Sequence, residues 1–143
     1  SINASDISIE AIKIAKLNAK KYNTRINFIK SDWFDNIIGV FDVIICNPPY
    51  VSKNEYVKLS LGVRRFEPKI ALYGGFKGLD CYRKIINNIF CFLKPNGLAF
   101  FEIGYNQKKD ICKLFKDYGY NKIDFFKDLT GKYRIVCVKK DAI

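Results

Sequence analysis

The chain has 143 residues, 49% of them apolar, which is enough for one hydrophobic core and too few for two ordinary domains. No apolar run approaches the ~18 residues of a membrane span, and no basic stretch followed by an apolar one begins the chain, so we expect a cytoplasmic protein without a targeting signal. The formal charge of +11 suits acidic partners such as nucleic acid. Because lysines are spread along the whole sequence, a general compositional bias explains this charge better than a dedicated patch.

The chain starts with an extended segment and a helix. Residues 1–6 read as the later half of a strand, and Ser8 is a suitable N-cap for a helix that ends near Lys21. One side of this helix is apolar at helical spacing: Ala11, Ile14, Ala15, Ala19 and Tyr22. Residues 25–30 then alternate as a short strand, and residues 41–46 form a continuous apolar run typical of a parallel strand buried on both faces.

A long segment separates this strand from the next regular elements. Residues 51–77 carry charges, one proline and the Gly74-Gly75 pair, and indicate a functional loop with at most short helices. A helix follows from residue 78 and stops at residues 94–97, before a strand over residues 98–103. Its apolar side is Leu79, Tyr82, Ile85, Ile86, Ile89, Phe90 and Leu93.

The last part of the chain predicts a helix and a hairpin. Ile111, Leu114, Phe115 and Tyr118 mark the apolar side of a helix that ends at Gly119. Residues 122–126 and 132–139 read as two strands joined by a turn. Alternating strands and helices with an antiparallel pair at the end predict an open, Rossmann-like α/β sheet, in which ligands bind beyond the carboxyl ends of the parallel strands.

The tetrapeptide Asn47-Pro48-Pro49-Tyr50 follows the apolar run directly and carries the clearest chemistry. Two prolines fix their own φ angles and restrict the residue before them, so Asn47 is held in one pose. Its carboxamide oxygen can accept a hydrogen bond from an NH2 group, and the carbonyl of Pro48 can accept the second proton. This arrangement suits a planar amide or amino nitrogen that must become a nucleophile.

Three further residues stand at or just after predicted strand ends. Asp6 can accept hydrogen bonds from ribose hydroxyls, Asp32 or its backbone can meet an adenine amino group, and Trp33 can cover a ring face. Each also has an ordinary structural explanation. Asp6 is a suitable helix-start residue, Asp32 a turn former and Trp33 a packing residue. Together with Asn47 they predict a site for a nucleoside-containing cofactor.

The five cysteines and the absence of histidine limit the chemistry further. The cysteines are Cys46, Cys81, Cys91, Cys112 and Cys137. They are scattered and form no C-x-x-C pair, so we expect reduced core thiols and no metal site. Catalysis must therefore depend on amides, carboxylates, backbone groups or a cofactor.

These motifs resemble known enzymes. The tetrapeptide, preceded by an acidic strand end and by Ser31-Asp32-Trp33-Phe34, resembles the class I S-adenosylmethionine-dependent methyltransferases that act on nitrogen in a planar group. Residues 63–68, 71–83, 101–104 and 128–134 resemble, more narrowly, the release factor glutamine methyltransferases. The match covers nearly the whole chain.

The resemblance implies a substrate, a cofactor and a set of site residues. The substrate would be the glutamine of the Gly-Gly-Gln loop in peptide chain release factors, methylated by direct in-line transfer from S-adenosyl-L-methionine. Asn47 would be the catalytic residue. The substrate would be bound by Asn47, Pro48, Pro49 and Tyr50, and the cofactor by Asp6, Asp32, Trp33 and Asn47.

The chain departs from the family pattern at its beginning. The family's glycine-rich cofactor loop matches none of the glycines here and would lie before residue 1, as would an N-terminal helical domain. The chain also contains no methionine to mark a translation start. We therefore interpret residues 1–143 as a partial catalytic domain, truncated at the N-terminus, whose missing first strand would lie between those ending at Asp6 and Cys46. We expect this piece alone to bind the cofactor weakly and to fold marginally.

Three alternatives remain open from the sequence. A nucleic-acid amino-methyltransferase shares the tetrapeptide, although no concentrated arginine-aromatic platform for single strands is visible. An inactive methyltransferase fragment with only a binding role is the second. The third is an active longer protein, for example a fusion, of which this chain is one portion.

Overall fold

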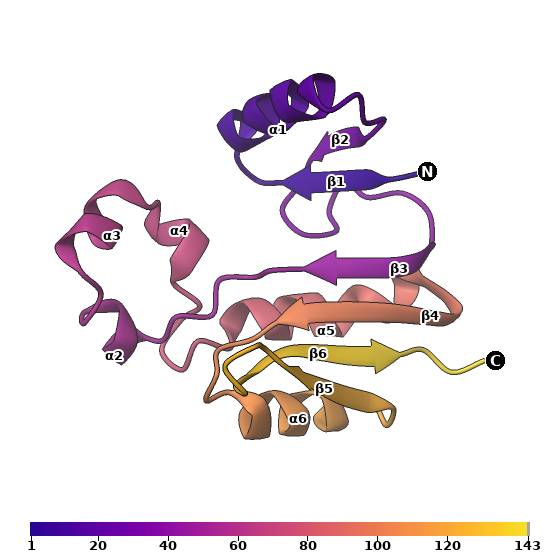
Figure 1. Ribbon diagram of the computed structural model, residues 1–143. Coiled ribbons are helices and arrows are strands. Elements are labelled where there is room, and N and C mark those ends of the chain that lie inside the picture. The colour runs from indigo at the N-terminus through magenta and orange to yellow at the C-terminus, as the bar shows by residue number, and fades with distance from the viewer. Residues whose placement is uncertain (143) are drawn as a thin grey trace. The chain divides into compact units, whose positions relative to one another are not determined.

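The computed structural model describes residues 1–142, which form two compact units. The first comprises Ser1–Gly39 and the second begins at Val40. Each unit has its own sheet, drawn as arrows in Figure 1. The mixture of helices with parallel and antiparallel strands confirms the predicted α/β class.

The first unit is a strand, a helix and a second strand. β1 (Asn3–Asp6) pairs in parallel with β2 (Asn27–Lys30), so that Asp6 lies opposite Lys30. Between them, α1 (Ile9–Lys21) begins after Ser8, whose hydroxyl accepts a 3.1 Å hydrogen bond from the amide of Ala11. The predicted N-cap and helix end are confirmed, while β2 starts two residues later than residue 25.

The buried side of α1 differs from the prediction. Ile12, which was not among the predicted core residues, is buried, whereas Ile14 is 59% exposed and Tyr22 is also exposed. Ala15 and Ala19 are half-buried and lie three and seven residues after Ile12, on the same side of the helix. Because α1 packs on only two strands, its buried stripe is narrow and centred on Ile12.

The second unit contains a four-stranded mixed sheet. Its members in spatial order are β3 (Phe41–Cys46), β4 (Leu93–Glu102), β6 (Tyr133–Lys139) and β5 (Ile123–Lys127). β3 runs parallel to β4, and the other neighbours are antiparallel. β5 and β6 form the predicted hairpin, whose turn is held by Asp128: its Oδ1 accepts from the amides of Thr130 and Lys132.

Two helices bury the apolar side of this sheet. α5 (Asp80–Phe92) and α6 (Lys108–Asp117) contribute most of the core that the sequence predicts. The buried side chains of α5 are Tyr82, Ile85, Ile86 and Ile89, and those of α6 are Ile111, Leu114 and Phe115. Tyr118, predicted on the apolar side, is 41% exposed instead and forms the C-cap of α6. β4 also begins earlier than residue 98, with a register shift between Phe41 and Val43 on β3.

β3 corrects a second expectation. The strand was predicted to be buried on both faces, but Ile45 is 81% exposed and Val43 is exposed as well. Within the described residues of the second unit β3 pairs only with β4, so one of its edges has no neighbour to support a covering layer. A missing neighbouring strand would explain this edge, and it stays a prediction.

The segment over residues 51–77 is the predicted loop with short helices. It contains α2 (Lys53–Tyr56), α3 (Leu61–Phe66) and α4 (Lys69–Leu72). Its two ends meet, since the amide of Val51 donates to the Leu72 carbonyl and the amide of Gly74 donates to the Val51 carbonyl, both at 2.9 Å. The segment therefore leaves and returns at one place (Figure 1).

The described residues also show two absences and the state of the cysteines. Among the described residues, no helix is both long and apolar enough to cross a membrane, and no group of three metal-ligating side chains occurs. All five cysteines are free thiols. Cys137 is buried and Cys91 is exposed, while Cys46, Cys81 and Cys112 are half-buried, so the expectation of core thiols was too broad.

Candidate functional site

The tetrapeptide Asn47–Tyr50 continues β3 as an extended segment with unequal burial along it. Pro48 is fully buried, while Asn47 immediately before it is exposed. The Asn47 carboxamide makes no hydrogen bond within residues 1–142. A fixed main chain therefore presents an amide whose donors and acceptor are free for a ligand.

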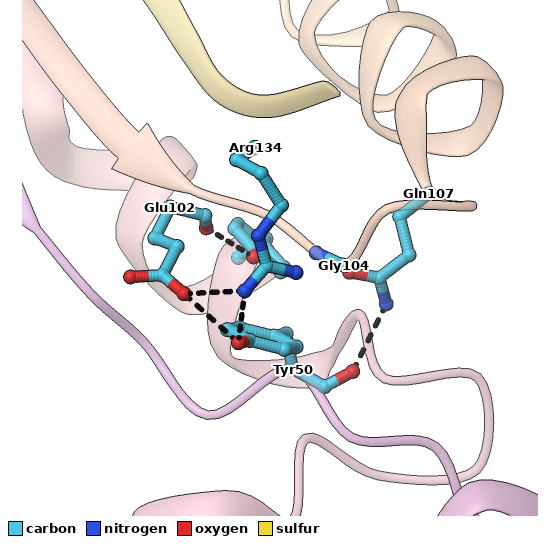
Figure 2. Close-up of polar contacts among 6 residues, drawn as sticks. Tyr50, Glu102, Gly104, Gln107 and Arg134 are labelled. Atoms are coloured by element: carbon cyan, nitrogen blue, oxygen red, sulfur yellow. Dashed lines mark hydrogen bonds and ion pairs between the residues drawn. The ribbon is translucent and has the colours of Figure 1, made fainter. Parts of the chain in front are cut away.

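Tyr50 at the other end of the tetrapeptide is anchored by two charged residues. Its hydroxyl donates a 2.9 Å hydrogen bond to Oε1 of Glu102, and Arg134 Nη2 donates to the same oxygen at 3.0 Å and to the Tyr50 hydroxyl at 3.1 Å (Figure 2). The Arg134 guanidinium carbon also lies 5.6 Å from the centroid of the Tyr50 ring. Glu102 and Arg134 thus restrict both the position and the rotation of the Tyr50 ring.

The environment of Tyr50 keeps its hydroxyl protonated. Partial burial raises the pKa of Tyr50 above its usual value, and the hydrogen bond to Glu102 raises that pKa further. Glu102 stands at the end of β4 and Arg134 near the start of β6, which are neighbouring antiparallel strands. The anchor therefore comes from the sheet rather than from a mobile loop.

The main chain at Gly74 also packs closely against the tetrapeptide. A Cβ atom at Gly74 would lie 2.5 Å from the Pro49 carbonyl oxygen and 2.9 Å from the Tyr50 Cα. These separations are shorter than any ordinary contact, so only glycine fits there. The end of the loop over residues 51–77 is thereby packed directly on the tetrapeptide.

In the first unit, Asp6, Asp32 and Trp33 lie at or just after the carboxyl ends of the two parallel strands. The amide of Ser31 donates a 3.0 Å hydrogen bond to the Asp6 carbonyl, which sets the residues after β2 beside the end of β1. Asp6 and Asp32 are exposed, and Trp33 is half-buried. The structure therefore brings together these three predicted cofactor residues, whereas Asn47 belongs to the second unit.

The Asp6 carboxylate can start the helix and still bind a ribose hydroxyl, which are the two roles considered from the sequence. Its Oδ1 accepts a 2.8 Å hydrogen bond from the amide of Ser8, which is the helix-start role. Its Oδ2 makes no hydrogen bond within the described residues, so one oxygen of an exposed carboxylate is open to a hydroxyl. This free acceptor fits a ribose, since a single carboxylate oxygen can accept from a diol.

A buried hydroxyl shapes the turn that carries Asp32 and Trp33. Ser31 Oγ donates to the Trp33 carbonyl at 2.9 Å and accepts from the Asn36 amide at 3.0 Å. Trp33 itself has a φ of 50°, in the left-handed region that a residue with a side chain seldom adopts. The hydroxyl of Ser31 thus holds the tryptophan in an unusual backbone conformation.

Sequence reasoning missed the supporting residues Ser31, Glu102 and Arg134. All three lie inside segments that carried the family resemblance. Glu102 is the last residue of β4, and Asn47 directly follows the parallel strand β3, so both stand at carboxyl ends of neighbouring strands. That position was a usable signal for Glu102. Nothing in the spacing indicated that Arg134 would lie beside Tyr50, because 84 positions separate them in the sequence.

The fold matches solved methyltransferases over the whole chain. A methyltransferase from Pyrococcus furiosus superimposes with a TM-score of 0.70 at 20% identity, covering 99% of this chain and 63% of that one. A ribosomal protein L11 methylase from Lactobacillus delbrueckii subsp. bulgaricus gives a TM-score of 0.70 at 17% identity, with 99% and 58% coverage. The chain has the class I methyltransferase fold.

Sequence comparisons define the relationship more closely. The family model described as "Methyltransferase small domain" matches residues 1–65. A release factor glutamine methyltransferase of Lactococcus lactis is 36% identical over 140 residues, which is 97% of this chain and 52% of that protein. A bifunctional methyltransferase of Rickettsia typhi is 41% identical over 139 residues, which is 95% of this chain and 27% of that protein.

These findings confirm the resemblance stated from the motifs. The chain is a homologue of the release factor glutamine methyltransferases over nearly all of its length. It spans about half the length of the release factor glutamine methyltransferases and about a quarter of the bifunctional enzymes that it matches.

Proposed function

We propose that the protein containing this chain transfers a methyl group from S-adenosyl-L-methionine to the side-chain amide of the Gly-Gly-Gln glutamine in peptide chain release factors. The observation that carries the proposal is the exposed, unbonded carboxamide of Asn47 on a segment fixed at Pro48 and Tyr50. Relatives named for glutamine methylation of release factors support the choice of substrate. Under this proposal the protein acts in the cytoplasm, where translation terminates.

The proposed role of the tetrapeptide is to orient a weak nucleophile. The lone pair of an amide nitrogen is delocalised into its carbonyl, so positioning and exclusion of water matter more than removal of a proton. Asn47 Oδ1 and the Pro48 carbonyl would accept the two N–H groups of the substrate amide and fix the direction of its lone pair. Pro49 and the anchored ring of Tyr50 would bound the flat substrate side chain.

We assign cofactor binding to Asp6, Asp32 and Trp33, with Asn47 as a further candidate. The free Oδ2 of Asp6 suits the ribose hydroxyls, Asp32 suits an adenine amino group, and the half-buried ring of Trp33 offers an apolar face. When bound, the cofactor would supply a methyl group on a cationic sulfonium. Neither role needs a metal ion.

The test is a methyl-transfer assay with the complete protein that contains this chain. Radiolabelled S-adenosyl-L-methionine is supplied with a purified release factor, with the same factor carrying alanine in place of the Gly-Gly-Gln glutamine, and with total tRNA. We expect label only in the unmodified release factor. Equal labelling of the alanine variant, or label in tRNA alone, would overturn the assignment of a glutamine amide.

A nucleic-acid substrate is the second candidate, and one structural observation favours it. Lys108 and Lys127 lie over the ring of Tyr133, and Lys132 lies over that of Tyr105. The Nζ of Lys108 lies 3.7 Å from the ring centroid of Tyr133, and that of Lys132 lies 5.1 Å from the ring centroid of Tyr105. Surfaces that bind single-stranded nucleic acid combine cationic side chains with aromatic rings, so the tRNA arm of the assay addresses this candidate directly.

A further inference from the structure

Apart from tyrosines, Gln107 and Ser31 are the buried polar side chains in the described part of the chain. Gln107 is 6% exposed and immediately precedes α6. Burial of an amide is unfavourable unless its donors and its acceptor are all paired. A buried glutamine at this position therefore needs specific partners.

The Gln107 amide joins three segments that are distant in sequence. Its Nε2 donates to the main-chain carbonyl of Tyr50 at 3.0 Å and to that of Gly78 at 3.2 Å. Its Oε1 accepts a 2.8 Å hydrogen bond from the amide of Gly104. Figure 2 shows the side chain pointing from the start of α6 toward the Tyr50 carbonyl. One side chain thus connects the end of the tetrapeptide, the end of the loop and the end of β4.

Two glycines make room for this amide. A Cβ atom at Gly78 would lie 2.2 Å from the Tyr50 carbonyl oxygen and 2.6 Å from Gln107 Nε2, and Gly78 has a φ of 73°. A Cβ atom at Gly104 would lie 2.8 Å from Gln107 Oε1. The partners of Gln107 are therefore packed so closely that its amide has one available position.

We infer that Gln107 is a positioning residue for the substrate-binding tetrapeptide. Glu102 and Arg134 fix the side chain of Tyr50, and Gln107 fixes its main chain. Because two stiff proline residues connect Tyr50 to Asn47, a fixed Tyr50 main chain also fixes the Asn47 carboxamide. This inference rests on the proposed function of the tetrapeptide.

Gln107 also fastens the loop over residues 51–77 at both of its ends. Tyr50 directly precedes the loop and Gly78 directly follows it, and the same Nε2 contacts both carbonyls. Loss of this amide would free the loop to move away from the tetrapeptide on which Gly74 packs. The expected consequence is a less well-ordered substrate, with the cofactor residues of the first unit unaffected.

Two substitutions separate positioning from simple loss of stability. Gln107→Met keeps the length of the side chain and removes every hydrogen bond, so we expect kcat to fall by about tenfold or more while KM for S-adenosyl-L-methionine changes by less than about twofold. Gln107→Glu places a carboxylate against two carbonyl oxygens, whereas the protonated acid can still donate one hydrogen bond. Its kcat relative to wild type should rise as the pH is lowered from about 9 to about 6, because burial favours the neutral acid.

The measurements use the complete protein, with Lys109→Met as the matched control. Lys109 is exposed in α6, two residues after Gln107, and its replacement should leave kcat unchanged. A wild-type kcat in Gln107→Met, or a loss confined to cofactor affinity, would overturn the inference. If Gln107→Met fails to fold, the pH dependence of Gln107→Glu decides, and a flat ratio would overturn it.

A second readout separates this inference from the proposed function. Hydrogen exchange at the amides of Gly104 and Val51 should be at least about tenfold faster in Gln107→Met than in Lys109→Met. This difference does not depend on the identity of the substrate. An inactive wild type with faster exchange in Gln107→Met would refute the proposed function alone, whereas unchanged exchange at both amides would refute the positioning role of Gln107.

Discussion

The hydroxyl of Tyr50 donates a 2.9 Å hydrogen bond to Glu102, a residue 52 positions further along the chain. The bond connects the segment after β3 to the end of the neighbouring parallel strand β4. Arg134 contacts both partners, so a charge-assisted cluster holds the residue that ends the tetrapeptide.

Removal of the Tyr50 hydroxyl tests this cluster. Tyr50→Phe should lower the free energy of unfolding by about 1 kcal/mol, since the side chains of Glu102 and Arg134 are each only 30% exposed and lose a partner. Tyr105→Phe is the control, because the Tyr105 hydroxyl makes no hydrogen bond within residues 1–142. Urea unfolding of the two variants measures the difference, and equal stabilities would show that the cluster contributes nothing.

The close approach at Gly74 gives a second prediction. Gly74→Ala should destabilise the fold by about 2 kcal/mol, because the added methyl group overlaps the Pro49 carbonyl and must displace main chain. Gly62→Ala in α3 should be neutral or stabilising by about 0.5 kcal/mol, since alanine is the better helix former and the site is open. The same unfolding assay compares them. A Gly74→Ala protein as stable as Gly62→Ala would contradict the packing described for the tetrapeptide.

The thiols should differ in reactivity with pH. Burial raises the pKa of Cys46 to about 12, whereas Cys91 is exposed. Because the thiolate is the reactive form, the Cys46 thiol should be alkylated much more slowly than Cys91 at pH 8, and its alkylation rate should rise as the pH is raised. Mass spectrometry after brief iodoacetamide treatment at pH 8 should find Cys91 modified and Cys46 intact. Equal modification of the two in the folded protein would show that partial burial does not suppress the reactivity of Cys46, and treatment in urea provides the fully reactive reference.

The only tryptophan offers a direct measure of cofactor binding. S-adenosyl-L-methionine should change the fluorescence of Trp33, and Asp6→Asn should weaken the affinity by about tenfold because a ribose hydroxyl loses a charged acceptor. Asp35 is an exposed acid in the turn that carries Trp33, and the Asp35→Asn variant should bind the cofactor as tightly as wild type does. A fluorescence change that is identical in Asp6→Asn and Asp35→Asn would remove Asp6 from the cofactor residues.

Helix caps and turns were predicted well because they depend on residues that are close together in the sequence. Ser8 before α1 and the turn at residues 128–131 act through neighbouring residues, and both are found where predicted. The predicted stop of the helix at residues 94–97 is off by two residues, because α5 ends at Phe92 and residues 94–97 belong to β4. The buried side of α1 was predicted wrongly because it depends on what the helix packs against. The exposure of Ile45 has the same origin, since an apolar run does not reveal whether both neighbouring strands are present.

The candidate site was predicted in part for a related reason. Asn47 and Tyr50 belong to a short motif whose chemistry can be read in sequence, and Asp6 and Asp32 follow from their place at strand ends. Arg134 and Gln107 act through contacts made 84 and 57 positions away from Tyr50, so their roles appear only once the strands are assembled. Residues that support a site are in this sense harder to predict than residues that touch a ligand.

The central claim is that the Asn47 carboxamide orients the nitrogen that is methylated. Transfer of labelled methyl groups to a release factor by the complete protein should fall about 100-fold or more in kcat for Asn47→Ala, while the exposed position of Asn47 leaves the fold intact. Asn54→Ala, another exposed asparagine in α2, is the matched control and should retain wild-type turnover. Equal turnover by Asn47→Ala and Asn54→Ala would contradict the claim.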